Sequence, residues 1–251
     1  MDFTVTKYQE LLTALECHKH HRIKHDVDLR PAFSLRIAEV EASQGVKSTY
    51  YFRSMQFTRY ADCIRAIADM GHGIGYHYEC LATCHGNIEE AYELFKSELA
   101  HLRLLVPVTT ACAHGSPLSP YDNQTIWNQY DIHALGIDEE PMLDTDFTRT
   151  LYLTDTGRRW DGSGVSIRDK VAGQQQRWAD EGLVFHSTDD IIWALQTPGH
   201  AIHRYDLLIN THPQRWMPFG AGWMVEATAQ WWKNHAKRLL VLRSNGVRDA
   251  I

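Results

Sequence analysis

Short apolar runs alternate with amphipathic segments about seven times along this chain of 251 residues. The runs are rich in β-branched and aromatic residues, which favour strands, and the segments between them have the apolar spacing of helices. Each helix must carry the chain back to the start of the next strand, so the alternation predicts parallel strands. The predicted strands lie within residues 22–28, 46–54, 73–79, 108–116, 149–157, 183–188 and 204–216.

Polar side chains follow these runs where the predicted strands end. They can converge only if the strand ends form a ring, as at the catalytic face of a barrel, because the edge of an open sheet would spread them apart. The sequence therefore predicts an α/β protein with one domain over residues 1–251, a (β/α) barrel of seven strands whose ring need not close completely. The side chains at the predicted strand ends are His25, Asp26, Asp28, His77, Glu79, His114, Asp155, His186 and His212.

Composition excludes several classes of protein. The net charge of -6, without a long basic run, argues against a nucleic-acid partner. The five cysteines are odd in number and scattered, which is typical of reduced thiols. No stretch of about 18 apolar residues occurs and the N-terminus does not resemble a signal peptide, so we expect a cytoplasmic protein without a transmembrane segment.

Two carboxylates mark the end of the first predicted strand. Asp26 and Asp28 point to the same side of an extended chain, where they repel each other unless a cation or a proton lies between them. His77 and His114 bring imidazoles to the same layer of the barrel, and a catalytic zinc site commonly has three such protein ligands. Asp28, His77 and His114 are therefore the candidate metal ligands. The alternative is a solvated strand end or a helix N-cap.

The motifs "KHDVD", "GHGIGYHYE", "AHGSP", "LTDTG" and "INTHPQRW" follow one another on successive predicted strands. In this order they resemble the NodB-type polysaccharide deacetylases of carbohydrate esterase family four, over residues 22–216. The resemblance is closest to divergent members associated with surface-polysaccharide or O-antigen assembly. It implies zinc or another divalent metal as cofactor, with Asp28 and His77 among its ligands.

The same resemblance implies catalytic roles. Asp26 corresponds to the general base, and His212 to the histidine that protonates the leaving amine. Asp155 with Arg158 falls where the family places a pair that orients the base. For Asp155 a surface salt bridge with an arginine remains an alternative, as does a strand-capping role for His212.

One position departs from the family pattern. Members usually have a second metal-binding histidine four residues after the one that matches His77, and this chain has Leu81 there. Either His85 reaches back from the next loop, or His114 is the third ligand, or the site binds metal weakly or not at all. We favour His114, because a side chain at a strand end is held more rigidly than one in a loop.

These residues predict a metal-dependent hydrolase that removes an N-acetyl or related acyl group from an amino sugar. The expected substrate is a nucleotide-linked or lipid-linked precursor of a surface polysaccharide. A carbohydrate-binding barrel that has lost its metal site is the alternative that Leu81 favours, and phosphoester cleavage ranks last. The apolar, tryptophan-rich segment 220–242 can close the barrel or join two copies into a homo-oligomer.

Overall fold

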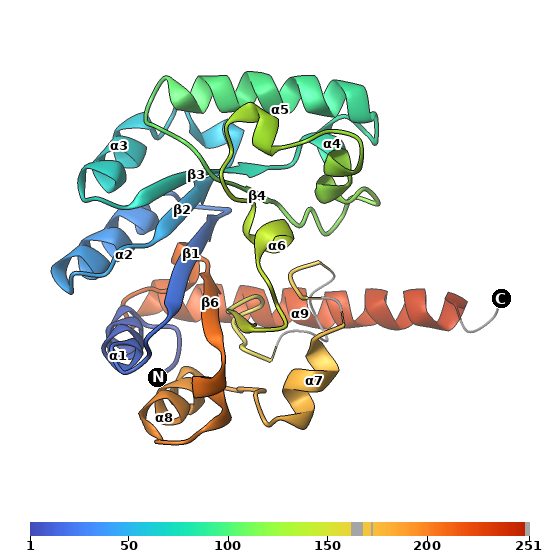
Figure 1. Ribbon diagram of the computed structural model, residues 1–251. Coiled ribbons are helices and arrows are strands. Elements are labelled where there is room, and N and C mark those ends of the chain that lie inside the picture. Colours follow the sequence, from blue (N-terminus) through green and yellow to red (C-terminus); the bar gives the residue numbers. More distant parts are fainter. Residues whose placement is uncertain (162–167, 172, 249–251) are drawn as a thin grey trace.

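Six parallel strands form one curled sheet in the computed structural model of Figure 1, which describes residues 1–161, 168–171 and 173–248, with side chains up to residue 234. The strand order across the sheet is β4-β3-β2-β1-β6-β5. Every neighbouring pair is parallel. The strands are β1 (His21–Val27), β2 (Thr49–Phe52), β3 (Gly73–Tyr78), β4 (Ala111–Ala113), β5 (Thr150–Thr154) and β6 (Asp206–Thr211).

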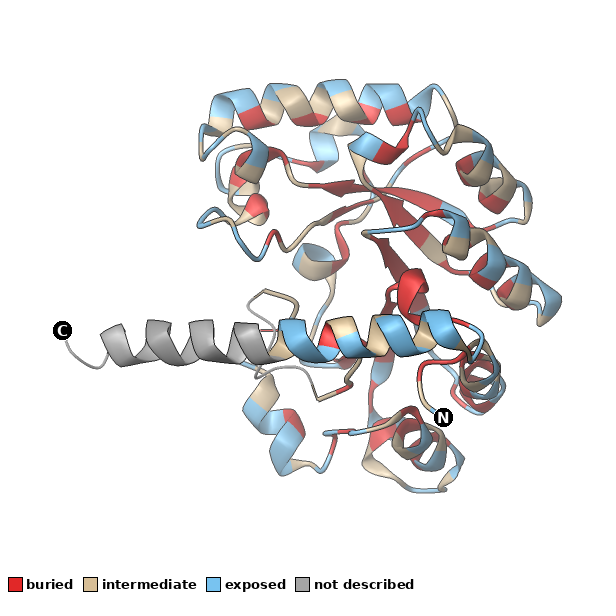
Figure 2. Ribbon diagram, turned by 180° about the vertical axis from the view of Figure 1, so that it is seen from behind, coloured by how far each residue is buried: buried red, intermediate tan, exposed pale blue. Residues whose placement is uncertain are grey.

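Helices return the chain between these strands and surround the sheet, so the strands are buried and the outer helix faces are exposed (Figure 2). The α-helices are α1 (Val5–Leu15), α2 (Ala32–Ser43), α3 (Ala61–Asp69), α4 (Cys80–Thr83), α5 (Ile88–Arg103), α6 (Pro141–Asp144), α7 (Gln175–Asp180), α8 (Thr188–Gln196) and α9 (Ala221–Arg248). Short 3-10 helices are η1 (Ser54–Gln56), η2 (Asn123–Asn128), η3 (His133–Leu135), η5 (Ala201–Arg204) and η6 (Pro213–Arg215).

The predicted architecture is confirmed as an incompletely closed (β/α) barrel. Strands β4 and β5 form the two edges of the sheet, and none of the strand pairs among the described residues joins them. Parallel pairing brings all six carboxyl ends to the same side. The polar residues that follow those ends are thereby brought around one opening.

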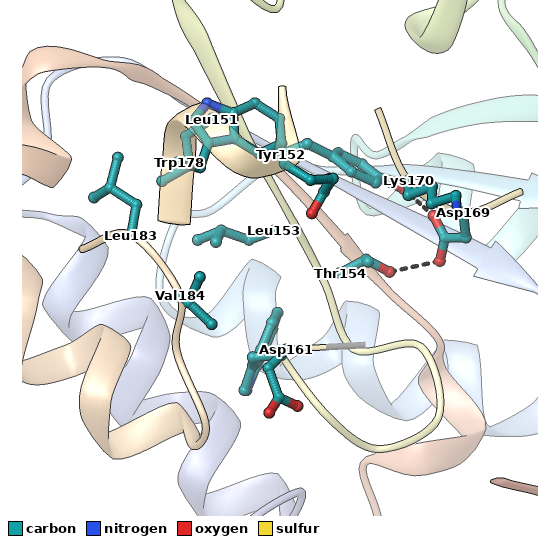
Figure 3. Close-up of a pocket in the computed structure, with 12 residues that line it drawn as sticks. Leu151, Tyr152, Leu153, Thr154, Asp161, Asp169, Lys170, Trp178, Leu183 and Val184 are labelled. Carbon is teal, nitrogen blue, oxygen red and sulfur yellow. Dashed lines mark hydrogen bonds between the residues drawn. The ribbon is translucent and has the colours of Figure 1, made fainter. Parts of the chain in front are cut away.

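The predicted seventh strand over residues 183–188 is wrong. This segment has no strand pairing, and residue 188 already begins α8. Leu183 and Val184 line a cavity of about 40 Å³ together with Leu151 and Leu153 of the edge strand β5. Figure 3 shows the residues around this cavity. The apolar run therefore covers the open edge of the barrel with side chains instead of extending its ladder.

His186 consequently does not join the ring of polar strand ends. Its side chain is 75% exposed, and its Nδ1 lies 2.8 Å from a carboxylate oxygen of Asp161.

Two of the amphipathic segments between the predicted strands are less helical than their apolar spacing indicates. The segment 123–136 contains only the 3-10 helices η2 and η3, and the segment 167–182 is helical only at α7, with residues 167 and 172 outside the described residues.

Helix α9 meets the domain through the first half of its length. Trp223 Nε1 donates hydrogen bonds to the carbonyl oxygens of Asp2 and Phe3, and Asn234 donates to Gly157 O at 2.8 Å. The helix thus joins the N-terminal segment to the loop after β5. No helix in the described part of the chain is both long enough and apolar enough to cross a membrane.

A buried carboxylate ties α2 to the sheet behind the strand ends. Glu41 is fully buried and accepts hydrogen bonds from the hydroxyls of Tyr8, Tyr50 and Ser48 at 2.5 to 2.6 Å, and from His25 Nε2 at 2.9 Å. Burial raises the pKa of Glu41, but His25 and the hydroxyl donors outweigh it and hold the pKa below its ordinary value of 4.5. These hydrogen bonds hold the face of β1 that carries His25, opposite to Asp26, against α2.

We expect Glu41→Ala to lower the free energy of unfolding by at least about 3 kcal/mol. The substitution leaves four buried donors without an acceptor, and each unsatisfied group costs about 1–3 kcal/mol. Urea unfolding followed by tryptophan fluorescence measures the change. A loss below about 1 kcal/mol would contradict this account of the network.

Glu41→Gln is the matched control, because it keeps the side-chain shape and one acceptor oxygen. Its loss should be smaller at neutral pH. The difference in unfolding free energy between wild type and this variant should also shrink below pH 4.5. The pKa of Glu41 is lower in the folded than in the unfolded chain, so the stability that its ionised form contributes is lost as the pH falls from the unfolded-state pKa through the folded-state pKa.

Candidate metal and catalytic site

The strand ends open into a cavity of about 450 Å³, a volume within the range of small-molecule sites. All the strand-end residues predicted as metal ligands line it, as do Asp26 and His212. Phe147 and Tyr152 give it aromatic surface. Lys24, Cys112, Lys170 and Arg215 also line it.

Strand β1 supplies three charged side chains to this cavity. Lys24 and Asp26 lie two residues apart on the strand and so point to the same face, and Asp28 follows just beyond its end. The backbone there is held by Gln56, whose Nε2 donates to Val27 O at 2.8 Å. The strand end is therefore rigid where its carboxylates project.

Asp28 lies among three imidazoles. Its Oδ1 is 3.4 Å from His77 Nε2 and 3.5 Å from His114 Nε2, and its Oδ2 is 3.6 Å from His212 Nε2. Oδ1 is buried and has no hydrogen-bond partner among the residues that the structure describes. One carboxylate oxygen and two imidazole nitrogens, all within 4.8 Å of one another, form the type of donor set that holds zinc.

The second nitrogen of each imidazole sets its orientation. His77 Nδ1 donates to the carbonyl oxygen of Cys112 at 2.9 Å, and His114 Nδ1 lies 3.1 Å from Glu79 Oε2. Nδ1 is the donor in each ring, so both Nε2 lone pairs face Asp28. A carboxylate or carbonyl behind each imidazole is the usual arrangement around a metal-binding histidine.

Charge shifts the pKa values around the cluster. Burial raises the pKa of Asp28, but the imidazoles of His77, His212 and His114 outweigh it and place the pKa far below its ordinary value. Burial lowers the pKa of His77, and the carboxylates of Asp26 and Asp28 reverse this and raise it. In Glu79, hydrogen bonds from His114 and Arg53 outweigh burial and lower the pKa to about 2. The carboxylates are thus ionised at neutral pH.

Only one of the two histidines considered as third ligand lies beside Asp28 and His77. His114 joins Asp28 and His77, whereas His85 is an exposed residue beyond the end of α4 and does not belong to the cluster. Leu81 is buried in the hydrophobic core. The imidazole that lies beside Asp28 and His77 thus comes from the end of β4 and not from α4 or the residues after it.

Asp26 has a different set of partners. Lys24 Nζ lies 2.8 and 3.0 Å from its two carboxylate oxygens, and Asn210 Nδ2 donates to Oδ2 at 2.8 Å. Burial raises the pKa of Asp26, but Lys24, His77 and His212 lower it far below the ordinary value. The carboxylate is fixed and ionised, and it is correspondingly a weak base.

The expected contact of Asp155 with the base is corrected by the structure. Asp155 is buried beneath His212, with Oδ1 at 2.6 Å from His212 Nδ1 and from Arg215 Nη1, and Oδ2 at 2.8 Å from Trp216 Nε1. Burial raises the pKa of Asp155, and Arg215 and His212 outweigh it and keep the pKa low. Asp155 therefore orients His212, not Asp26.

The two arginines after β5 lie outside this cluster. Arg158 stacks over the rings of Phe3 and Trp223, at 5.3 and 4.6 Å from their centroids, and so belongs to the contact with α9. Arg159 pairs with Asp161 at 2.7 Å and not with Asp155. The surface salt bridge considered for Asp155 is therefore wrong, because Asp155 is buried and its arginine partner is Arg215, not Arg158.

Three residues of the cluster were missed in the sequence, namely Lys24, Asn210 and Arg215. Lys24 carried a usable signal, since it shares the strand face of Asp26 by the same two-residue spacing. Asn210 and Arg215 stand in the motif "INTHPQRW", but nothing in it indicates their contacts to Asp26 and Asp155, which join β6 and η6 to residues 184 and 60 positions away in the chain.

Comparison with known proteins gives distant structural likeness only. No family model matches the sequence, and no curated protein matches it. A Streptococcus mutans CE4 esterase has 14% identity and a TM-score of 0.45, over 96% of this chain and 89% of that one. A family 4 carbohydrate esterase from Bacillus subtilis has 10% identity and a TM-score of 0.42, over 89% and 83%.

A CE4 family pseudoenzyme from Bacillus anthracis has 13% identity and a TM-score of 0.44, over 88% of this chain and 62% of the other. The chain thus spans less than two thirds of the pseudoenzyme's length. All three solved structures are described as members of the carbohydrate esterase family that the sequence motifs resemble. At these scores the likeness carries no functional assignment, which depends on the side chains of this chain.

We expect Asp28→Asn and His114→Ala each to reduce bound zinc at least tenfold, since the first replaces a charged oxygen donor with a neutral one and the second removes a nitrogen donor. Elemental analysis of protein purified without a histidine tag measures the zinc content. His85→Ala is the matched control and should keep the wild-type content. Equal zinc content in wild type and in His114→Ala would contradict the proposed ligand set.

Proposed function

We propose that this protein is a metal-dependent hydrolase that removes an N-acetyl or related acyl group from an amino sugar. The observation that carries the proposal is the convergence, in one cavity, of a three-donor cluster with two proton-transfer candidates. The cluster is formed by Asp28, His77 and His114. Asp26 and His212 line the same cavity.

The three donors would hold zinc or another divalent cation. Two observations support this fit. Asp28 Oδ1 has no hydrogen-bond partner among the described residues. The Nδ1 hydrogen bonds of His77 and His114 turn the Nε2 lone pairs of both rings toward Asp28. A cation in such a site polarises a carbonyl group and lowers the pKa of a bound water molecule. With three protein ligands, the donor set leaves a coordination position for water or substrate.

Asp26 is the proposed general base. Lys24 and Asn210 hold both of its oxygens, and its low pKa keeps the carboxylate ionised and ready to accept a proton from the attacking water. Because so weak a base binds the proton only loosely, Asp26 can release it again after the water has attacked the acyl carbon.

His212 is the proposed general acid. The short contact of its Nδ1 with Asp155 fixes the ring, and its Nε2 faces the cavity beside Asp28. A proton on Nε2 can therefore be donated to the amine nitrogen as the carbon–nitrogen bond breaks. Asp155 stabilises the positively charged ring, and Arg215 and Trp216 keep Asp155 in place.

The substrate would be an N-acetylated sugar bound against the aromatic surface of the cavity. Phe147 and Tyr152 line it and can pack on the apolar face of a pyranose ring. Exposed Lys170 also lines the cavity, which favours a phosphate next to the sugar, as in a nucleotide-linked or lipid-linked precursor. From the motif resemblance, we assign this precursor to surface-polysaccharide or O-antigen assembly.

The first test is acetate release from N-acetylamino sugars by the zinc-loaded protein. The panel should contain nucleoside-diphosphate-linked sugars, lipid-linked sugars and free oligosaccharides, each assayed with and without a chelator. Chelator-sensitive release supports the proposal. A protein that binds these sugars without releasing acetate, and contains no stoichiometric metal, would instead be a carbohydrate-binding barrel.

On an active substrate, we expect Asp26→Asn and His212→Asn each to lower kcat about 10²–10⁴-fold, the usual contribution of a positioned acid or base. Bound zinc should stay near the wild-type amount in Asp26→Asn, because Asp26 is not among the proposed ligands. Steady-state kinetics and elemental analysis on the same preparations measure both quantities. Exposed His186→Asn is the control for His212→Asn, and an equal effect of the two would refute the role of His212.

Asp155→Asn should lower kcat about 10–100-fold with a smaller change in KM, because the variant loses the carboxylate that orients His212. Asp161→Asn is a matched control, since Asp161 also pairs with an arginine and a histidine but lies outside the cavity. Equal kcat values for the two variants would show that Asp155 does not act through His212.

A further inference from the structure

Two sets of metal-binding side chains overlap at the strand ends. One is the proposed set of Asp28, His77 and His114. The other consists of Asp26, His77 and Cys112, whose ligand atoms also lie within 4.8 Å of one another and which are all buried. Thiolate, imidazole and carboxylate are good zinc ligands, so the second set is chemically as competent as the first.

The two sets compete for the same nitrogen. His77 belongs to both, and its Nδ1 is occupied by the hydrogen bond to the Cys112 carbonyl. Only Nε2 remains as a ligand, so a cation bound to it lies either toward Asp28 or toward Asp26. An ion on the second set would also take Asp26 as a ligand and remove the proposed base.

The ammonium group of Lys24 lies at this second set. Its Nζ is 2.8 and 3.0 Å from the oxygens of Asp26 and 3.2 Å from Cys112 Sγ. The side chain is almost fully buried and extends over the ring of Tyr51, with Nζ 5.5 Å from the ring centroid. A tethered positive charge thus occupies the space that a cation would need there.

The placement of the lysine depends on Tyr51, which in turn depends on a glycine of the next strand. A Cβ atom at Gly75 would lie 2.4 Å from the Tyr51 ring, so only glycine lets this ring pack across β3. Tyr51 OH is held by a hydrogen bond of 2.8 Å to Thr110. Lys24 is therefore confined between a fixed ring and the two side chains that it contacts.

We propose that Lys24 determines which of the two donor sets holds the cation. Its ammonium excludes a metal ion from Asp26, His77 and Cys112, so that the ion binds at Asp28, His77 and His114 and Asp26 stays free. Lys24 is in this sense a positioning residue for both the cation and the base. The inference rests on the proposed function, since it assumes that the first set binds a divalent cation.

Cobalt(II) is the probe that distinguishes the two sets, because a thiolate bound to cobalt gives a charge-transfer absorption in the near ultraviolet that nitrogen and oxygen ligands do not give. The full chain is stripped of metal and reloaded with cobalt(II). Wild type should bind one equivalent without the thiolate band. Lys24→Met should also bind one equivalent but show the band, and Lys24→Met/Cys112→Ser should lack it.

Two further variants complete the experiment. Lys170→Met removes an exposed lysine from the same cavity and should leave the wild-type spectrum unchanged. Lys24→Gln removes the charge but keeps a hydrogen-bond donor to Asp26. It should show the thiolate band too, and it replaces Lys24→Met in the experiment if that variant does not fold. In either Lys24 variant kcat should fall at least 100-fold with a smaller change in KM, because Asp26 becomes a ligand.

The outcomes separate the inference from the proposed function. Wild type that binds no cobalt would overturn the proposed metal site itself. Wild type that binds cobalt while the Lys24 variants bind it without a thiolate band would overturn only the role of Lys24. A thiolate band already present in wild type, or the failure of both Lys24 variants to fold, would also overturn that role.

Discussion

The structure depends on the balance of charge at the carboxyl end of β1. Two carboxylates lie there, Asp26 in the buried part of the strand and Asp28 just beyond its end, and each needs positive charge or hydrogen-bond donors to remain ionised. Asp26 finds them within the chain, in Lys24 and Asn210. Asp28 faces three imidazoles instead, and one of its oxygens has no hydrogen-bond partner in the described part of the chain. This difference gives two neighbouring aspartates different chemistry.

Strands β1 and β6 are held together on the side that faces away from the cavity. On the reverse face of β1, His25 connects the Glu41 network to Thr211 on β6, with His25 Nδ1 at 2.7 Å from the threonine hydroxyl. The strand that carries Asp26 and the strand that leads to His212 are therefore locked together directly beneath the cavity. Such support is what a site requires if its acid, base and ligand groups are to keep fixed distances.

The proposed acid has its own separate support. Asp155 receives a hydrogen bond or ion pair from His212, Arg215 and Trp216, which follow one another closely after β6. One short segment thus provides both the proposed acid, His212, and the two side chains that hold Asp155.

The open edge of the barrel beside β5 is covered by the side chains of residues 183 and 184, without a seventh strand.

The sequence by itself determined the alternation of strands and helices, the parallel sheet, and the identity of the polar residues at the strand ends, because these depend on local periodicity and on the common direction of parallel strands. It also indicated Asp28, His77 and His114 as a set, since each lies at such an end. Tertiary structure decided the rest. The number of strands, the partner of Asp155 and the role of Arg215 depend on contacts between segments distant in the chain. The pairing of Lys24 with Cys112 likewise joins residues 88 positions apart, and no local pattern records it.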